Sequence, residues 1–134
     1  MPGEPLPADV VDMATFEELL EMDEDDPGFS QSLVENFFEQ TEDVLKEMQR
    51  SLALRNLDAL SRQGHFLKGS AAAIGIIELR KAFERIQYLG QGKVESDAGP
   101  ITPDQALAQI EQLMGDVSVD LAEARRAFAA YYQA

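Results

Sequence analysis

Residues 64–75 read GHFLKGSAAAIG and contain the only histidine of this 134-residue chain. Apolar residues in and before this stretch recur every three or four positions, which is the spacing of one face of an α-helix. They are Leu57, Leu60, Gly64, Leu67, Ala71 and Ile74. His65 points well away from them, on the side of the helix that also carries Lys68 and Gly69. We therefore predict a helix that buries one face and presents its histidine to water.

Outward from this stretch, the same periodicity predicts further helices. The expected helices span residues 16–22, 27–53, 57–74, 77–89 and 103 onwards. Side chains that can satisfy the free N–H groups of a first helical turn stand at several of the starts. They are a capping box of Thr15 and Glu18, the N-cap Asp26 followed by Pro27, the N-cap Asn56, and a second capping box of Thr102 and Gln105.

These elements predict one helical domain. Apolar residues of the last helix recur at alternating steps of three and four, the seam expected between helices of a bundle. No segment alternates apolar and polar residues as a strand would. The pattern indicates an all-α fold, an up-down-up-down four-helix bundle with the short first helix across one end. The Pro-rich residues 1–12 are expected to be a loose leader, so the bundle domain covers residues 13–134.

Composition limits the classes of partner and chemistry. The formal net charge of −14 repels phosphate backbones and anionic lipid, so we expect neither nucleic acid nor a membrane as partner. The chain has no cysteine, and a single histidine leaves little for a zinc site. Neither a membrane span nor a secretory signal is recognisable. The predicted location is the cytoplasm, with the nucleus left open as a second location.

Three separate stretches resemble one protein family. Residues 65–75 have the pattern His-x-Leu-Lys-Gly-Ser-x-Ala-x-x-Gly, which is similar to the signature of histidine-containing phosphotransfer proteins. Residues 84–90, ERIQYLG, resemble the fungal branch of that family, as do residues 22–26, MDEDD, followed by Phe29 and Ser30. The resemblance is close over most of the chain and looser in the last helix. It implies the helical bundle that the periodicity also predicts.

The residues around His65 suit phosphoryl transfer. Neutral imidazole keeps a nitrogen lone pair near pH 7 and can accept a phosphoryl group. Lys68 can neutralise phosphoryl oxygens, and Gly69 leaves room for a second protein. By resemblance, Gln87 matches a glutamine that hydrogen-bonds the histidine ring. The resemblance also implies no cofactor in this chain, because the partner brings the metal and the acceptor aspartate.

The resemblance further implies the partners. His65 would take a phosphoryl group from the receiver-domain aspartate of a hybrid histidine kinase and pass it to the receiver of a response regulator. Such a protein is a phosphocarrier and not a kinase, and the chain has no ATP-binding motif. We expect a monomer that docks receivers through a patch around the histidine. The matching residues are Leu19, Met22, Asp23, Phe29, Leu33, Val34, Ser70 and Ala72.

Two positions depart from the family pattern, and two other interpretations stay open. Ala71 stands where many relatives have serine, and Gln91 stands where the fungal pattern often has a basic residue. The chain could instead be a helical adaptor whose acid-ringed apolar end binds a partner helix, with His65 chemically idle. It could also be a phosphotransfer domain of a larger kinase, although the capping signals at both ends of the bundle favour a separate domain.

Overall fold

The computed structural model describes residues 3–94 and 99–133. Its helices are α1 (Met13–Glu21), the short 3₁₀ helix η1 (Met22–Glu24), α2 (Phe29–Ala53), α3 (Leu57–Ile74), α4 (Ile77–Gly90) and α5 (Pro103–Tyr132). Within the described residues no strand forms, and extended backbone pairs only in isolated bridges such as that between Val11 and Ile76. The all-α fold predicted from periodicity is confirmed.

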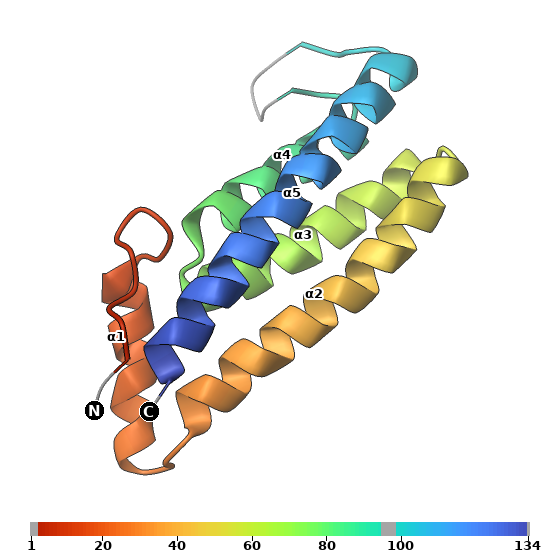
Figure 1. The fold of residues 1–134 in the computed structure, drawn as a ribbon. Helices are drawn as coiled ribbons and strands as arrows, with labels where there is room; N and C mark the ends of the chain where they lie inside the picture. The colour runs from red at the N-terminus through yellow and green to blue at the C-terminus, as the bar shows by residue number, and fades with distance from the viewer. Residues whose placement is uncertain (1–2, 95–98, 134) are drawn as a thin grey trace.

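Helices α2 to α5 run alternately up and down and form a four-helix bundle (Figure 1). Each packs on the next along the chain, and α5 returns to pack on α2. The short helix α1 lies at the end of the bundle where α5 ends, and Glu4 is hydrogen-bonded to Ala130 of α5 there (Figure 1). It contacts both α2 and α3. The topology is the one that the sequence predicts.

The core consists of the apolar stripe of each helix. On α3 the predicted stripe is buried from Leu60 to Ile74, and on α5 the predicted seam is buried from Leu107 to Phe128. Every long helix buries its apolar stripe and exposes its polar side, so the four helices surround one hydrophobic core. No helix in the described part of the chain combines the length and apolar character that a membrane span needs.

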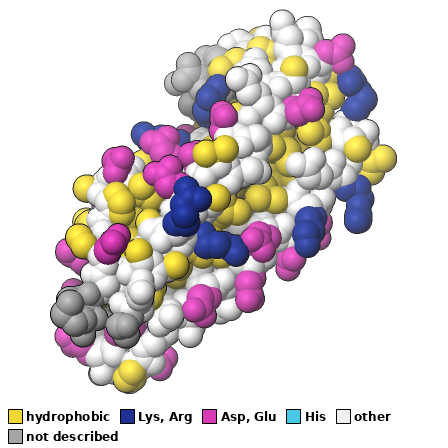
Figure 2. All heavy atoms as spheres, in the orientation of Figure 1, with side chains coloured by type: hydrophobic (Ala, Val, Ile, Leu, Met, Phe, Trp, Pro, Cys, Tyr) yellow, Lys and Arg dark blue, Asp and Glu magenta, His cyan; other side chains and the backbone are white. Residues whose placement is uncertain are grey.

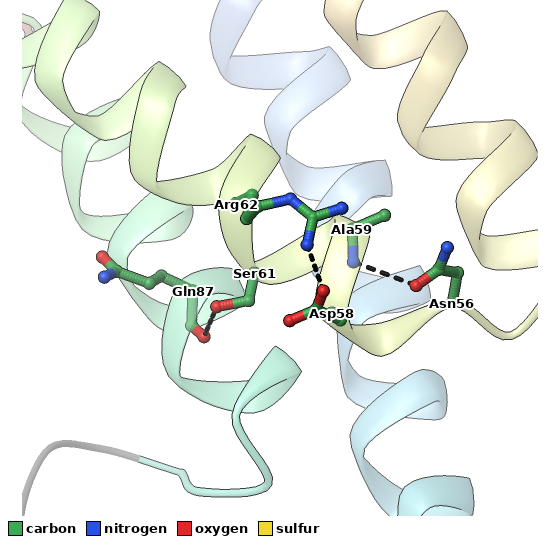
Figure 3. Close-up of polar contacts among 6 residues, drawn as sticks. All are labelled: Asn56, Asp58, Ala59, Ser61, Arg62 and Gln87. Carbon is green, nitrogen blue, oxygen red and sulfur yellow. Dashed lines mark hydrogen bonds and ion pairs between the residues drawn. The ribbon is translucent and has the colours of Figure 1, made fainter.

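The local signals at two helix starts act as predicted. The side chain of Asn56 accepts a hydrogen bond from the backbone N–H of Ala59 at 3.0 Å and caps α3 (Figure 3). Thr102 and Gln105 form the capping box at the start of α5, each side chain bonded to the other residue's backbone N–H. These two caps fix where the histidine helix and the last helix begin.

The predicted start of the first helix is wrong. It begins at Met13 because Asp12, and not Thr15, provides the cap. The Asp12 carboxylate accepts hydrogen bonds from the backbone N–H of Ala14 at 3.2 Å and from the Thr15 hydroxyl at 3.1 Å. Thr15 therefore supports the cap from inside the helix.

The predicted start of the second helix is also wrong. It begins at Phe29, since Gly28 and not Asp26 is the N-cap residue. Gly28 has a φ of 84°, a left-handed conformation that favours glycine. Its missing side chain cannot accept the N–H groups of the first turn, so the cap must come from elsewhere in the chain.

The expectation of a loose leader fails for the described residues 3–12. Leu6 is buried and Val11 is 0% exposed, and both belong to the main core. The backbone N–H of Asp12 donates to the carbonyl of Gly75 at 2.7 Å, and the N–H of Ile77 donates to that of Val10 at 3.1 Å. The segment therefore packs on the junction between α3 and α4, a contact that no local pattern indicates. Residues 1–2 lie outside the described residues.

Two glycines allow α3 and α4 to approach closely. A Cβ on Gly64 would lie 2.9 Å from the carbonyl oxygen of Phe83 and 3.0 Å from the backbone nitrogen of Gln87. A Cβ on Gly90 would lie 2.7 Å from the carbonyl oxygen of Leu57 and from the backbone nitrogen of Ser61. All four distances are shorter than ordinary contacts, so the close packing of α3 on α4 depends on glycine at both positions.

Candidate functional site

His65 lies near the middle of α3, and its side chain is exposed to solvent. Gly64 and Leu67, on the core side of the same turn, are buried. Figure 2 shows the face formed by α2 and α5, where hydrophobic side chains are visible along the seam between the helices and no histidine is in view. His65 therefore opens onto another face of the bundle, as its helical phase predicts.

The surface beside His65 is open. Gly69 and Ala72, which share its side of the helix, are exposed, and Lys68 is half-buried. A Cβ on Gly69 would meet no atom within 4 Å. Glycine inside a helix costs about 1 kcal/mol relative to alanine, and no close packing explains it here, in contrast to Gly64. Gly69 therefore suits the approach of another molecule and not the packing of this one.

Two charged residues, one turn and two turns before His65, are paired with each other. The guanidinium of Arg62 forms an ion pair with the carboxylate of Asp58, four residues earlier on the same side of α3 (Figure 3). Both side chains are largely exposed, so the pair contributes little to stability. Lys68, the other cation one turn from His65 on α3, takes part in none of the ion pairs among the described residues.

Gln87 lies on α4 beside the turn of α3 that precedes His65. Its backbone carbonyl accepts a hydrogen bond from the Ser61 hydroxyl at 2.9 Å, and its side chain extends away from Ser61 (Figure 3). The side-chain amide oxygen is buried and accepts no hydrogen bond from the described residues. No hydrogen bond between this amide and His65 occurs in the part of the chain that the structure describes. The predicted ring contact stays a prediction.

Most of the predicted docking residues reach the surface near the α1–α2 connection. Met22 is 53% exposed, and Leu19, Phe29 and Leu33 are half-buried. Val34 does not belong with them, because it is 2% exposed and faces α5. One residue beyond Leu33, the helix has turned by about 100°, which carries Val34 from the surface into the core. The assignment of Val34 to the docking surface is therefore wrong.

A shallow hollow lies between α2 and α3. Its volume is about 160 Å³. Its lining combines apolar with uncharged polar side chains: Leu33, Asn36, Phe37, Gln40, Ser70, Ala73 and Ile74. Leu33 of α2 and Ser70 of α3, both among the predicted docking residues, thus line the same hollow. An exposed hollow of this composition is typical of a surface that another protein covers.

Phe66 is a surface residue that the sequence analysis did not single out. It follows His65 directly and is 46% exposed. Its backbone carbonyl accepts a hydrogen bond from the Ser70 hydroxyl at 3.3 Å. The available signal was a large aromatic residue off the apolar stripe, next to the only histidine. Phe66 thus adds an exposed aromatic ring directly after His65 in the sequence.

Asp23 has a structural role that its assignment to the docking surface did not include. It is half-buried, and its two carboxylate oxygens accept hydrogen bonds from the backbone N–H and the hydroxyl of Ser30. Asp23 therefore supplies the cap that Gly28 cannot give to α2.

No metal site is visible among the described residues. Nowhere in residues 3–94 and 99–133 do three or more acidic, histidine or cysteine side chains gather in a way that could hold an ion.

The site therefore combines a solvent-exposed histidine on a helix of the bundle with a neighbouring lysine and a glycine that has free space around it. This is the arrangement expected of a histidine phosphotransfer protein. Residues 32–120 match the model of the Hpt domain, and the chain belongs to this family of histidine phosphotransfer proteins. Among its relatives are phosphorelay proteins of fungi.

The relatives are yeast proteins. The phosphorelay intermediate protein YPD1 of Candida albicans is 51% identical over 81 residues, which are 60% of this chain and 44% of that protein. The protein of the same name from Saccharomyces cerevisiae is 39% identical over 87 residues, 64% of this chain and 52% of that protein. The chain thus spans about half the length of these relatives.

A solved structure matches nearly the whole chain. It is the co-crystal structure of the Saccharomyces cerevisiae histidine phosphotransfer signalling protein Ypd1 with the receiver domain of its downstream response regulator Ssk1. Its similarity to this fold has a TM-score of 0.81 at 27% identity, over 96% of this chain and 97% of that chain. The bundle and its N-terminal additions are therefore shared with a phosphotransfer protein whose receiver complex is known.

Proposed function

We propose that this protein is a phosphorelay intermediate. His65 accepts a phosphoryl group from the aspartate of one receiver domain and passes it to the aspartate of another. The observation that carries the proposal is the exposure of the only histidine on a helix of an Hpt domain, beside an open Gly69. The names of the yeast relatives and the receiver complex of the Saccharomyces protein support the same role.

The transfer needs little from this chain beyond the imidazole. The lone pair of a neutral ring nitrogen attacks the phosphorus of the aspartyl phosphate, the P–O bond to the aspartate breaks, and the carboxylate leaves with the bonding pair. A P–N bond forms, and the other ring nitrogen keeps its proton. The same steps in reverse load the second receiver. Phosphoryl transfer of this kind depends mainly on position and on neutralised charge.

Three neighbours support the imidazole. Lys68 places a positive charge one turn from the ring, where it can pair with phosphoryl oxygens. Gly69 lets the loops of the receiver reach the ring without a side chain in the way. The amide oxygen of Gln87 is buried and has no hydrogen-bond partner among the described residues, so it can accept a hydrogen bond from the ring N–H and fix the orientation of the imidazole.

The wider assignment concerns partners and place. The donor is the receiver of a hybrid histidine kinase, and the acceptor is the receiver of a response regulator, which brings the metal that the reaction needs. We take the protein to act as a monomer, away from membranes and nucleic acid, in the cytoplasm and, for regulators located there, in the nucleus. A fluorescent fusion tests the location, and sedimentation tests the oligomeric state.

Transfer from a receiver tests the function. A receiver domain loaded with ³²P-phosphate is mixed with wild-type protein and with His65→Gln, which keeps the helix and removes the nucleophile. Label moves to the wild type and then to a second, unlabelled receiver, whereas the variant takes none. Equal labelling of both proteins would place the acceptor elsewhere. Receiver binding without any transfer would favour a helical adaptor.

A further inference from the structure

A chain of partly buried hydrogen bonds joins the last turn of α5 to the connection between α1 and α2. The Ser30 side chain, on a residue that is 0% exposed, contacts the Asp23 Oδ2 atom at 2.6 Å and the Tyr132 hydroxyl at 2.7 Å. The backbone N–H of Ser30 donates to Asp23 Oδ1 at 2.7 Å. Ser30 thus links the nearby Asp23, seven residues earlier, to the last turn of α5, 102 residues later.

The direction of these bonds follows from the donors available. A carboxylate has no proton, so the Ser30 hydroxyl donates to Asp23. That hydroxyl has only one proton, so its contact with Tyr132 requires the phenol to donate. Burial raises the pKa of Tyr132 to about 12, and the negative charge of Asp23 acts in the same direction. The phenol therefore keeps its proton, and stays a donor, throughout the neutral range.

The same turn of α5 also holds α1. The ring of Phe16, which is fully buried on α1, packs edge-on against Phe128 at a centroid distance of 5.4 Å, against Tyr131 at 5.5 Å and against Tyr132 at 6.5 Å. The end of α5 therefore anchors α1 through aromatic packing and α2 through the hydroxyl of Tyr132. Those two helices flank the segment that carries Met22 and Phe29.

We propose that Tyr132 is a positioning residue for receiver docking, which acts through Ser30 and Asp23 on the shape of the α1–α2 connection. Met22 lies at one end of this connection and Phe29 at the other, and both belong to the predicted docking surface. The N-cap Gly28 offers no side chain, so the Asp23–Ser30 contact is what fixes the first turn of α2. The inference rests on the proposed function, because it concerns how receivers bind.

The experiment compares two neighbouring tyrosines. Tyr132→Phe removes only the hydroxyl that bonds Ser30. Tyr131→Phe is the matched control, since its half-buried hydroxyl takes part in none of the described side-chain hydrogen bonds. For each variant, the rate of phosphoryl transfer from a loaded receiver is measured against receiver concentration. His65 is also phosphorylated with phosphoramidate, a small donor that needs no docking surface.

Tyr132→Phe is expected to raise the KM for the receiver about threefold to tenfold, the range for one lost hydrogen bond, and to leave the rate at saturating receiver unchanged. Phosphorylation by phosphoramidate stays at the wild-type rate, and Tyr131→Phe behaves as wild type. Ser30→Ala removes the bond from Tyr132 together with the bond to Asp23, so it raises KM at least as much, and adding Tyr132→Phe to it gives no further rise.

An unchanged KM for Tyr132→Phe would overturn the inference, as would an equal rise for Tyr131→Phe. A lower saturating rate at constant KM, with a lower melting temperature, would mean that the hydroxyl only stabilises the fold, and would overturn it too. These results differ from a failure of the proposed function, in which the wild-type protein itself would take no phosphoryl group from any receiver.

Discussion

Replacing Gly64 by alanine tests whether the α3–α4 contact places the histidine helix. The new Cβ would lie 2.9 Å from the carbonyl oxygen of Phe83, 3.0 Å from the backbone nitrogen of Gln87 and 3.2 Å from Cγ2 of Ile86. Ordinary contact begins at 3.4 Å, so α4 must move by about half an ångström. Two of these three atoms belong to backbone and cannot rotate away.

The expected magnitude follows from two opposing effects. Overpacking of this kind typically costs about 1–3 kcal/mol. Alanine in place of glycine inside a helix returns about 1 kcal/mol. We expect Gly64→Ala to lower the free energy of unfolding by up to about 2 kcal/mol. Because Gln87 moves with α4, we also expect slower phosphoryl transfer in folded protein.

The assay is urea unfolding followed by circular dichroism, with Gly69→Ala as the matched control. Gly69 stands on the same helix, and its Cβ would meet nothing within 4 Å, so this variant gains helix propensity without a clash. We expect it to be more stable than wild type by about 0.5–1 kcal/mol. If Gly64→Ala gained as much stability as Gly69→Ala, the reasoning about close approach would be refuted.

Three further predictions concern the site and the charge of the bundle. Lys68→Ala should slow transfer to His65 about tenfold with no change in melting temperature, since it removes a half-exposed charge near the phosphoryl oxygens; rapid-quench kinetics measure this, and a wild-type rate would remove Lys68 from the mechanism. Gly69→Gln should fold normally but lose receiver binding in titration calorimetry, because the side chain fills the open surface; unimpaired binding would contradict the steric role. Burial raises the pKa of Asp120 above its ordinary value of 3.8, and the nearby Glu78, Glu123 and Asp116 raise it further. The ionised carboxylate of Asp120 therefore destabilises the folded state at every pH above its raised pKa. Asp120→Asn should increase the melting temperature at pH 7. This gain should vanish as the pH falls toward 3.8, because the carboxyl group is then protonated in the folded protein. The exposed Asp43→Asn serves as the control for net charge, and an equal gain from it would show that Asp120 has no special environment.

Local signals were sufficient where the partner of a residue is close in sequence. Asn56 caps a nitrogen three residues away, and Thr102 and Gln105 satisfy each other, so both helix starts could be predicted. The exposure of His65 followed from helical phase alone, because neighbouring apolar residues define which face is buried.

The sequence was insufficient where the partner is distant. The α2 cap comes from Asp23, which lies outside the helix and seven residues before Ser30. The leader residue Val11 is buried and pairs with Ile76, at the start of α4. Val34 is another example, since a half-apolar helix does not reveal which of its edges meets a neighbour. Gly64 and Gly69 also cannot be told apart by sequence. Gly64 is crowded and Gly69 is open only because α4 packs against the first and not against the second.

The most direct test of the central claim is to locate the phosphoryl group on the chain. After reaction with a loaded receiver, the protein is digested with trypsin at neutral to alkaline pH and analysed by mass spectrometry. We expect one phosphoryl group on the peptide of residues 63–68, carried by His65, stable in base and lost in acid. A phosphoryl group on any other peptide, or one that withstands acid, would contradict it.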